Sequence, residues 1–511
     1  MSLLAANERR FLEIVSGFAY CNPFLEEHTR LERQALGREF IDGEPFWSRP
    51  VNDPEKPRAN VWRISERSRK LAEQVRERLT GGAKASAAEL ILYEDSVLHA
   101  LYQGYYPRFF EASFGAAAKE ANRWRFYADF REEWRRFLEI PGVRFPTRHD
   151  PTHTFACFRQ IQRAFEQIFR DIIGGSMPAA RLRASIWQSI FTHDMRRYRR
   201  TLYGRMSEFA TLITGPSGTG KELAARAIAQ SRYVPFDDKK LAFADDEIAP
   251  FYPINISALS PTLVESELFG HRRGSFTGAI GDRKGWLETC PALGSVFLDE
   301  LGDLDPAIQV KLLRVIETRT FHPVGETKAL EFRGKLIAAT NKNLESAIAK
   351  GDFREDLYYR LCSDQIATPS LAEQLRDSPG VMGELVIYMS RRVAGVEGDE
   401  LARDVETWIA AHLPRGYAWP GNYRELEQCV KNVLIRRDYK PARTRPADPL
   451  AATLEDLRGG RLTADELLSR YCTIVYRETG SYEETSRRIG LDRRTVKSKI
   501  DRELLSRLKE R

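Results

Sequence analysis

The sequence predicts a multidomain protein in which an α/β region lies between two mostly helical regions. From about residue 201 to 365, strand-like and helix-like patterns alternate, as a parallel sheet with covering helices requires. The segments on either side follow the helical period of 3.6 residues instead. A glycine-rich stretch directly follows the first expected strand. We therefore place the domains at 1–185, 186–365, 366–438 and 461–511, with a proline-containing linker at 439–460.

The composition is typical of an intracellular globular protein. The chain has 511 residues, enough for about three domains, with 42% hydrophobic and 30% charged residues. No apolar run approaches the roughly 20 residues of a membrane span, and Met1–Phe18 lacks the basic-then-apolar order of a signal peptide. We expect a cytoplasmic protein without a membrane partner. The net charge of +7 permits nucleic-acid binding without requiring it.

The cysteine and histidine spacings indicate neither a zinc site nor a disulfide framework. No two cysteines stand in C-x-x-C spacing. His149 and His153 are four residues apart, but Pro151 between them disfavours a helix that presents both, so we expect a surface loop. The six cysteines are Cys21, Cys157, Cys290, Cys362, Cys429 and Cys472.

The first region, 1–185, carries no catalytic signature. Apolar and aromatic residues recur at helical spacing in two stripes, which form either a helical core or a ligand pocket or partner surface, and core is the commoner outcome. Pro50–Arg58 predicts a loop. The arginines of 181–200 predict a basic helical connector that contacts DNA or a neighbouring subunit, or is a solvated helix face. The stripes comprise Trp124, Tyr127, Phe130, Trp134, Phe137, Leu138, and then Phe155, Phe158, Ile161, Phe165, Ile168, Phe169, Ile172 and Ile173.

A phosphate-binding loop is predicted between a short buried strand, Thr211–Thr214, and a helix, Leu223–Gln230. Glycines allow a tight turn whose backbone N–H groups point at phosphate oxygens, and Lys221 supplies a cation for the β- and γ-phosphates. Glu222 stands where the general motif has Ser or Thr. We expect a nucleotide, ATP, to contact Gly215, Pro216, Ser217, Gly218, Thr219, Gly220, Lys221 and Glu222.

Two later strands are expected to bring polar groups to the same site. Gly294–Glu300 is an apolar strand that ends in two carboxylates, where Asp299 would hold Mg²⁺ and Glu300 would polarise the attacking water. Ile337–Asn341 is another such strand, and Asn341 either senses the γ-phosphate and orients water or is a turn residue.

These stretches together resemble the AAA+ domain of the sigma-54-dependent transcription activators, from about Leu212 to Arg437. The Glu after the loop lysine is typical of that family. The segment Ser266–Ala279 resembles the family's S-E-L-F-G-H-E-x-G-A-F-T-G-A loop, which engages sigma-54. Its predicted contact residues are Gly274, Ser275, Phe276, Thr277, Gly278 and Ala279, with Phe276 and Thr277 at an exposed, mobile tip. Ser275 in place of Ala, and Arg272 in place of an acidic residue, depart from the motif.

The resemblance implies further roles. Asn255 is expected to hold Glu300 in an inactive pose. Arg354 and Arg360 correspond to arginine fingers that reach the γ-phosphate of the adjacent subunit, although an ion pair within the domain is the alternative. The motif Trp419–Leu426 is similar to the second sensor and would direct Arg424 at the nucleotide from a helical lid. The insertion Tyr233–Pro250, acidic at 237–238 and 245–247, is longer than the family leads us to expect and has no assigned role.

The C-terminal stretch Ser481–Ile500 predicts a helix–turn–helix, with Gly490 at the turn and Asp492 capping the second helix. It resembles the family's Fis-type domain, in which the preceding helix, here Leu462–Arg477, also dimerises. Double-stranded DNA is expected to contact Arg493, Arg494, Thr495, Lys497, Ser498 and Lys499.

The predicted protein is thus a mostly helical regulatory domain, an AAA+ P-loop ATPase with a helical lid, and a helix–turn–helix domain. The resemblance implies a hexameric ring, or a dimer when inactive, that hydrolyses ATP to open promoters for sigma-54 RNA polymerase. Alternatives are a DNA-binding regulator that acts without sigma-54 and, less favoured, a general remodelling ATPase. Residues 1–185 lack the acidic cluster, Thr and Lys of a phosphoacceptor receiver, which leaves ligand sensing and protein-partner control open.

Overall fold

A computed structural model describes residues 3–43, 59–120, 122–147, 150–244, 249–441 and 462–509, together with 453–454, 456–457 and 460. The expected loop Pro50–Arg58, His149, residues 245–247 of the insertion and most of the linker lie outside the described residues. The chain forms two compact units, Met1–Tyr439 and Lys440–Arg511. Within the described residues, no helix combines the length and the apolar character needed to cross a membrane.

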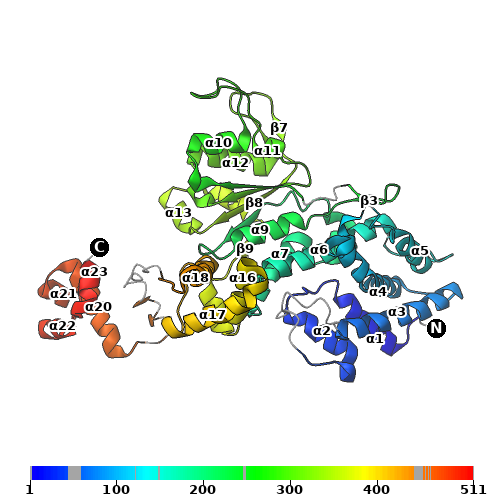
Figure 1. Cartoon of the computed structure of the whole chain (residues 1–511), viewed down its shortest axis with the longest axis horizontal. Coiled ribbons are helices and arrows are strands. Elements are labelled where there is room, and N and C mark those ends of the chain that lie inside the picture. The colour runs from blue at the N-terminus through cyan, green and yellow to red at the C-terminus, as the bar shows by residue number, and fades with distance from the viewer. Residues whose placement is uncertain are drawn as a thin grey trace. The chain divides into compact units, whose positions relative to one another are not determined.

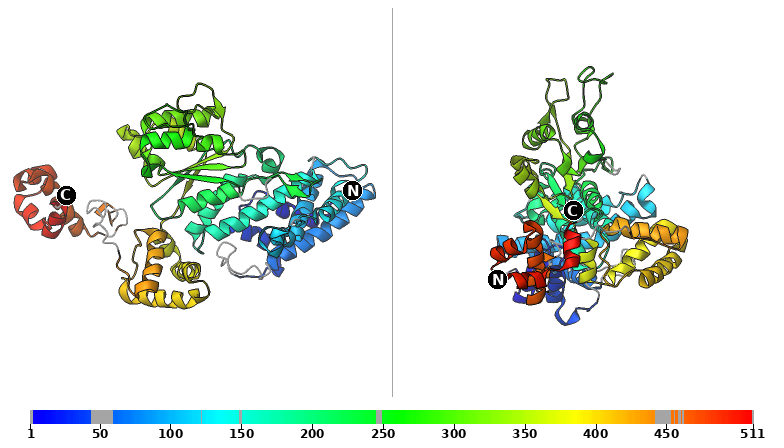
Figure 2. Two further views of the ribbon diagram at one scale, coloured as in Figure 1. Left: turned by 45° about the horizontal axis from the view of Figure 1, so that its top comes forward. Right: turned by 90° about the vertical axis from the view of Figure 1, so that its left-hand side faces the viewer.

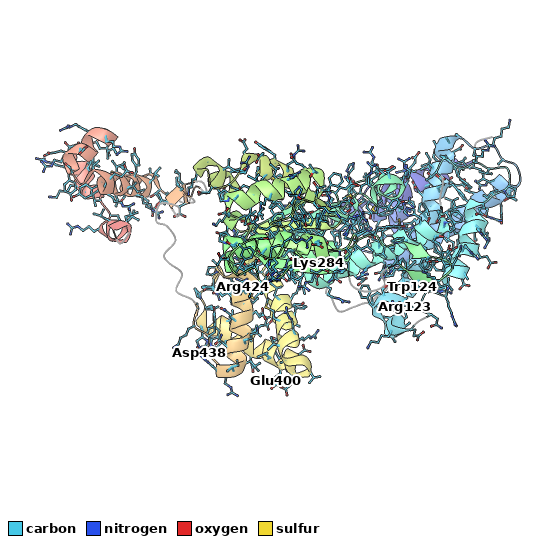
Figure 3. All side chains as sticks on the ribbon, turned by 90° about the horizontal axis from the view of Figure 1, so that it is seen from above. Arg123, Trp124, Lys284, Glu400, Arg424 and Asp438 are labelled. Carbon is cyan, nitrogen blue, oxygen red and sulfur yellow. The ribbon has the colours of Figure 1, made fainter. Side chains whose placement is uncertain are left out.

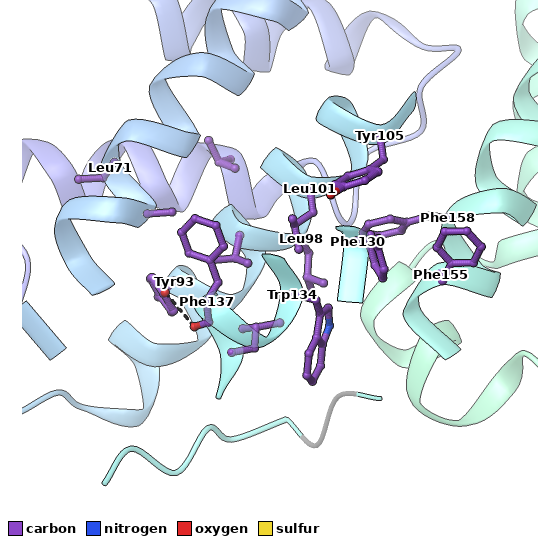
Figure 4. Packing of buried hydrophobic residues seen from close by; sticks show 14 of the residues in the cluster. Leu71, Tyr93, Leu98, Leu101, Tyr105, Phe130, Trp134, Phe137, Phe155 and Phe158 are labelled. Atoms are coloured by element: carbon purple, nitrogen blue, oxygen red, sulfur yellow. Dashed lines mark hydrogen bonds between the residues drawn. The ribbon is translucent and has the colours of Figure 1, made fainter. Parts of the chain in front are cut away.

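The N-terminal region is helical, as predicted (Figure 1). The aromatic stripes form its core: Trp134, Phe137 and Phe130 of the first stripe pack with Phe155 and Phe158 of the second (Figure 4). Ile161 and Ile173 are only half-buried. The helices are α1 (Ala6–Gly17), α2 (Glu26–Leu36), α3 (Ala59–Thr80), α4 (Ala87–Phe114), α5 (Tyr127–Leu138), α6 (Pro151–Asp171) and α7 (Met177–Phe191), with short turns at Gly37–Glu39 and Ala116–Lys119.

A five-stranded parallel sheet lies at the centre of the larger unit, in the order β4-β5-β8-β1-β9. Its strands are β1 (Thr211–Thr214), β4 (Phe251–Asn255), β5 (Ser295–Asp299), β8 (Lys335–Thr340) and β9 (Gln365–Ala367). The inner strands are apolar on both faces, because helices cover both. The intervening elements are α9 (Lys221–Gln230), η5 (Ile256–Ala258), α10 (Pro261–Phe269), α11 (Trp286–Thr289), η6 (Leu301–Asp303), α12 (Pro306–Thr318), α13 (Leu344–Lys350), α14 (Glu355–Leu361) and the short pair β6 (Thr320–Phe321) and β7 (Leu330–Glu331).

The two sheet faces pack against different helices. On one face, Leu212, Val296 and Leu298 pack in a core that includes α10, α12 and α14. On the other face, Ile213 and Phe297 share a core with α9 and with α6 and α7, which precede the sheet in sequence. Figures 1 and 2 show α6 and α7 beside α9. The expected boundary at 185 therefore falls inside α7, and the N-terminal region completes one face of the sheet. A short segment, α8 (Met195–Arg197) and η4 (Tyr198–Leu202), leads from α7 to β1.

The insertion forms a small hairpin, β2 (Phe236–Asp237) and β3 (Ala242–Phe243). Phe236 and Phe243 enter the aromatic core of the N-terminal region, where Phe243 packs edge-on to Trp124 at 4.9 Å between ring centroids. The Arg159 guanidinium lies over the Phe243 ring at 3.9 Å. Trp124 of the N-terminal region, labelled in Figure 3, thus packs against Phe243 of the insertion in the α/β region. The insertion, which the sequence left without a role, fastens the two regions together.

The helical lid follows the sheet and has its own core. It consists of α15 (Leu371–Asp377), α16 (Val381–Ala394), a turn at Gly395–Glu397, α17 (Gly398–His412) and α18 (Asn422–Arg436). The start of α7 contacts it: the backbone N–H of Met177 donates to Asp377 at 2.8 Å and that of Gly175 to Glu384 at 3.0 Å.

The second unit consists of α20 (Ala464–Thr479), α21 (Tyr482–Ile489), α22 (Arg493–Lys499) and α23 (Arg502–Lys509), coloured orange to red in Figure 2. Gly490 ends α21 with φ of 71°, and the Asp492 side chain accepts the Arg494 N–H at the start of α22. Thr485 and Val496 are buried between the helices. Gly490 and Asp492 are the predicted turn and cap, and DNA binding by this unit remains a prediction.

Candidate nucleotide-binding site

The phosphate-binding loop, 215–221, has the backbone that the glycines predict. Gly215, Gly218 and Gly220 have φ of 146°, 76° and 88°, which other residues rarely adopt. A Cβ at Gly215 would collide with Thr368, and one at Gly218 with the Gly421 carbonyl. The loop is therefore held between the sheet and the lid, and its glycines are needed for space as well as for φ.

Lys221 begins α9 and is buried inside the loop. Its Nζ donates to the carbonyl oxygens of Gly215 at 3.0 Å and Pro216 at 3.1 Å. Burial lowers the Lys221 pKa, Glu300 and Asp299 act in the opposite direction, and Arg424 adds to the lowering. The Lys221 ammonium at the start of α9 thus interacts electrostatically with the two carboxylates that follow β5 and with the lid arginine. Glu222 instead points outward and pairs with exposed Arg226 at 2.8 Å.

The acidic pair lies at the carboxyl end of β5, next to the loop. Asp299 Oδ1 accepts the Glu300 N–H at 3.0 Å. Glu300 has φ of 56° and ψ of 46°, a left-handed conformation that costs about 1–3 kcal/mol for a residue with a Cβ. Its Oε2 is buried and has no hydrogen-bond partner among the described residues. Strain and an unsatisfied carboxylate oxygen at one residue indicate a group positioned for chemistry.

The expected contact between Asn255 and Glu300 is not formed. Asn341 Nδ2 donates to Glu300 Oε1 at 3.2 Å, whereas Asn255 Oδ1 accepts the Ser257 hydroxyl at 2.8 Å. Asn255 pairs in register with Asp299, one position before Glu300. The left-handed turn at Glu300 directs the carboxylate towards β8, where Asn341 stands. Asn341 is thus the amide that orients Glu300 in this structure.

The lid contacts the phosphate loop through the predicted second-sensor motif. Arg424 Nη1 donates to Ser217 Oγ at 3.3 Å, and the Asn422 side chain donates to the Ser217 carbonyl at 2.9 Å (Arg424 is labelled in Figure 3). Sequence analysis missed Thr368, whose hydroxyl lies 2.6 Å from that of Thr219. It directly follows β9, an edge strand in which only Ile366 is buried, so the rule that pointed to Asn341, a polar residue after a buried strand, does not identify it.

The two expected arginine fingers lie on the surface in local ion pairs. Arg354 pairs with Asp356 at 2.6 Å, and Arg360 pairs with Glu317 at 3.0 Å. The Arg354 guanidinium lowers the pKa of the Asp356 carboxyl. Exposed pairs of this kind contribute at most about 1 kcal/mol, so either guanidinium can leave its partner at little cost.

The loop 274–279 is fastened at its base. Arg272 forms ion pairs with Glu326 at 3.1 Å and Asp282 at 3.6 Å, and the Ser275 hydroxyl donates to the Val324 carbonyl at 2.8 Å. Both departures from the family motif therefore hold the loop to the segment 323–326. Phe276 is half-buried, because its ring packs edge-on to His271 at 4.9 Å, so its expected exposure is wrong. Thr277 is exposed, and Ile280, which sequence analysis did not single out, is 88% exposed.

The predicted DNA-contact residues on α22 differ in availability. Arg493 pairs with Glu483 at 3.0 Å and Lys499 pairs with Asp465, whereas Arg494, Lys497 and Ser498 are exposed. Thr495 is half-buried.

Residues 192–367 match the model of the sigma-54 interaction domain. The Nif-specific regulatory protein of Herbaspirillum seropedicae is 43% identical over 228 residues, which are 44% of this chain and 38% of that protein. The sigma-54-dependent transcriptional regulator SfnR of Pseudomonas fluorescens is 42% identical over 231 residues, 45% of this chain and 57% of that protein. The transcriptional regulatory protein ZraR of Klebsiella oxytoca is 37% identical over 306 residues, 58% of this chain and 64% of that protein.

The chain thus spans less than two thirds of the length of these relatives. With the parallel sheet and the lid, the match confirms the predicted fold class of a helical N-terminal region followed by an AAA+ α/β region. The C-terminal helix–turn–helix is not part of the matched family model, which ends at residue 367. Residues 192–367 therefore resemble the sigma-54 interaction domain, and this part of the chain is similar to transcriptional regulators such as SfnR.

Proposed function

We propose that this chain is a cytoplasmic, ATP-driven transcription activator that remodels sigma-54 RNA polymerase to the open promoter complex while bound to DNA upstream. The observation that carries the proposal is the match to the sigma-54 interaction domain, in a chain that also has the phosphate loop, an acidic pair at the end of β5 and a lid arginine that contacts Ser217 of the loop.

ATP would bind with its phosphates against the loop N–H groups, Lys221 and the start of α9. Asp299, at the end of β5, is the residue to hold Mg²⁺, which when bound neutralises phosphate charge. Glu300, oriented by Asn341, would accept a hydrogen bond from the attacking water through Oε2, the oxygen without a partner. Arg424, on lid helix α18, would contact the bound nucleotide and so couple the position of the lid to nucleotide binding.

Assembly would complete the site. In our proposal Arg354 and Arg360 exchange their surface partners for the γ-phosphate held by the neighbouring copy in a hexameric ring, whereas the inactive protein is a dimer. The weakness of both surface pairs supports this exchange, since a charge-assisted contact to phosphate is stronger.

Nucleotide state would reach the sigma-54 loop through β4. The end of β4 pairs with the end of β5 at Asn255 and Asp299, and β4 leads through η5 to α10, which ends just before His271. A shift at Glu300 can therefore pass across the β4–β5 pairing and then along η5 and α10 to Phe276 and Thr277, the proposed contacts to sigma-54. The second unit would tether the ring to DNA through Arg494 and Lys497, with the remaining α22 residues in support, and so raise its concentration near the promoter.

The test is co-migration of the full chain with sigma-54 in the presence of ADP and aluminium fluoride. Wild type is compared with Thr277→Ala and with Thr327→Ala, an exposed threonine outside the loop. We expect a nucleotide-dependent complex that only Thr277→Ala loses, with ATP hydrolysis retained in all three. If all three proteins hydrolyse ATP but none forms a complex with sigma-54, the proposal is wrong. The chain would then be a DNA-binding regulator that acts without sigma-54.

A further inference from the structure

The N-terminal region contains a cavity of about 390 Å³. Residues from α1, α2, α3, α4, α6 and α7, and from the segment α8–η4, line it, and its wall is mainly apolar. Its volume lies in the range of sites that hold small organic molecules, roughly 300–1,000 Å³. Leu98 and Phe158, drawn in the core of Figure 4, also form part of this wall. Apolar side chains from Val15, Phe18, Leu98, Phe158, Phe165 and Trp187 contribute to it.

One cation on this wall has no bonded partner. The guanidinium of half-buried Arg199 forms no hydrogen bond and no ion pair with any residue that the structure describes. The nearby carboxylate of Asp95 is already engaged by Ser16 at 2.7 Å and by Arg196. Burial lowers the Arg199 pKa, which reflects the cost of holding this charge away from water.

The other polar groups of the wall are already paired or uncharged. His28 Nδ1 lies 3.3 Å from Glu32. Burial, with a smaller contribution from His28, lowers the pKa of His99 to about 4, so its imidazole is neutral at pH 7. His99 Nδ1 is buried and has no hydrogen-bond partner within the described part of the chain. Among the described residues, the cavity therefore offers a guanidinium without a bonded partner and a neutral imidazole, on a mainly apolar wall whose two carboxylates, Glu32 and Asp95, are already paired.

We propose that this cavity binds a small organic acid, with its apolar body among the aliphatic and aromatic side chains and its anionic group on Arg199. A neutral apolar molecule leaves the buried cation without a partner. An anion gives it charge-assisted hydrogen bonds, which are about twice as strong as neutral ones. The bound acid would then be the signal that the N-terminal region senses. The sequence alone had left open whether this region responds to a ligand or to a protein partner.

The site lies on the route to the ATPase. Trp187 on α7, Met195 on α8 and Arg199 on η4 all line the cavity, and η4 leads to β1 and the phosphate loop. Trp187 also packs in the core that α7 shares with α9 and the sheet. The bound acid would therefore stabilise one arrangement of α7 against the sheet. This regulatory consequence rests on the proposed function, whereas the binding does not.

The experiment uses the full chain and the fluorescent anion 1-anilinonaphthalene-8-sulfonate, with the uncharged N-phenyl-1-naphthylamine as its neutral counterpart. We expect saturable binding of both probes to wild type. Arg199→Met should weaken binding of the anion by roughly tenfold or more and leave the neutral probe within about twofold. Arg200→Met, which removes the exposed neighbouring guanidinium, should change neither.

A second variant, Ala19→Phe, fills the cavity and should abolish saturable binding of both probes. Thermal unfolding by circular dichroism reports whether each variant is folded. The proposal is overturned if folded wild type binds neither probe, if Ala19→Phe binds both normally, or if Arg199→Met weakens both probes equally. Since these readouts need neither ATP nor sigma-54, their failure is distinguishable from failure of the proposed function.

Discussion

The N-terminal region and the C-terminal helices are attached to the ATPase in different ways. Helices α6 and α7 bury apolar side chains in the core beneath β1 and β5, and the hairpin β2–β3 returns Phe236 and Phe243 to the N-terminal aromatic core. The C-terminal helices instead form a compact unit of their own, Lys440–Arg511. The N-terminal region shares cores with the α/β region, and the C-terminal helices form a separate unit.

The difference indicates two kinds of control. A region that shares a core transmits small shifts directly, because packed interiors do not deform continuously. The α6–α7 turn reinforces this link: Arg183 is buried and donates to the Ile172 and Gly174 carbonyls, next to the contacts with the lid. In the proposed function the C-terminal unit has only to hold a ring near its DNA target, for which a separate unit is sufficient.

The largest expected effect comes from removing each region. Deleting residues 1–185 takes away α6 and half of α7 and exposes Ile213, Phe297 and Ile337 to water, so we expect an insoluble or non-cooperatively unfolding product. Deleting 440–511 should leave the unfolding temperature of the larger unit within a few degrees of wild type and retain ATP hydrolysis. Calorimetry and ATPase rates compare the two. A soluble 186–511 fragment that hydrolyses ATP contradicts the shared-core interpretation.

The second-largest effect is expected from a substitution in the hairpin β2–β3. Phe243→Ala should lower the free energy of unfolding by about 3–4 kcal/mol, because the ring is 5% exposed and packs on Trp124, Phe155 and Phe236. Lys239→Ala, at the exposed turn of the same hairpin, should cost under about 0.5 kcal/mol. Denaturant unfolding measures both. Equal effects mean that the insertion is a surface loop and does not join the regions.

The sequence predicted the strands of the α/β region better than it predicted how the N-terminal region packs against them. Strand 211–214 has the predicted bounds, and the strands expected at 294–300 and 337–341 are found at 295–299 and 335–340, since strands buried on both faces appear as uninterrupted apolar runs. Apolar spacing shows which face of α6 and α7 is buried but not what covers it, so the boundary at 185 fell inside α7. The two-residue strands of the hairpin are too short to produce a pattern.

Among the candidate sites, too, the sequence shows local features but not contacts that depend on how distant segments pack. The phosphate loop is recognisable because its chemistry depends on backbone conformation, which demands glycines at fixed spacing. Which amide holds Glu300 depends on sheet order and on the left-handed turn at Glu300, neither of which the sequence states. The cavity beside Arg199 is built from side chains of helices that are far apart in the sequence, and no local motif marks it.

A smaller effect is expected from a single substitution in the C-terminal unit. Lys497→Ala removes an exposed charge on α22 and should weaken binding to random-sequence duplex DNA several-fold, reducing the slope of log affinity against log salt by about 1. ATP hydrolysis and thermal unfolding of the larger unit should not change. Fluorescence anisotropy across a salt series measures the slope, with Lys239→Ala as the matched control. A slope that both variants leave unchanged places DNA contact elsewhere.

The smallest expected effect concerns the contact between α7 and the lid. Asp377 accepts the Met177 N–H at the start of α7, where a carboxylate also interacts favourably with the helix dipole, and the pair is exposed. Asp377→Ala should therefore lower the free energy of unfolding by only about 0.5 kcal/mol. It should also weaken ADP binding by about twofold, since a less restrained lid positions Arg424 and Asn422 less well against Ser217. Glu400→Ala, an exposed carboxylate elsewhere on the lid that Figure 3 labels, should change neither quantity. If ADP affinity, measured by calorimetry, is the same in both variants, the N-terminal region reaches the nucleotide through the sheet alone.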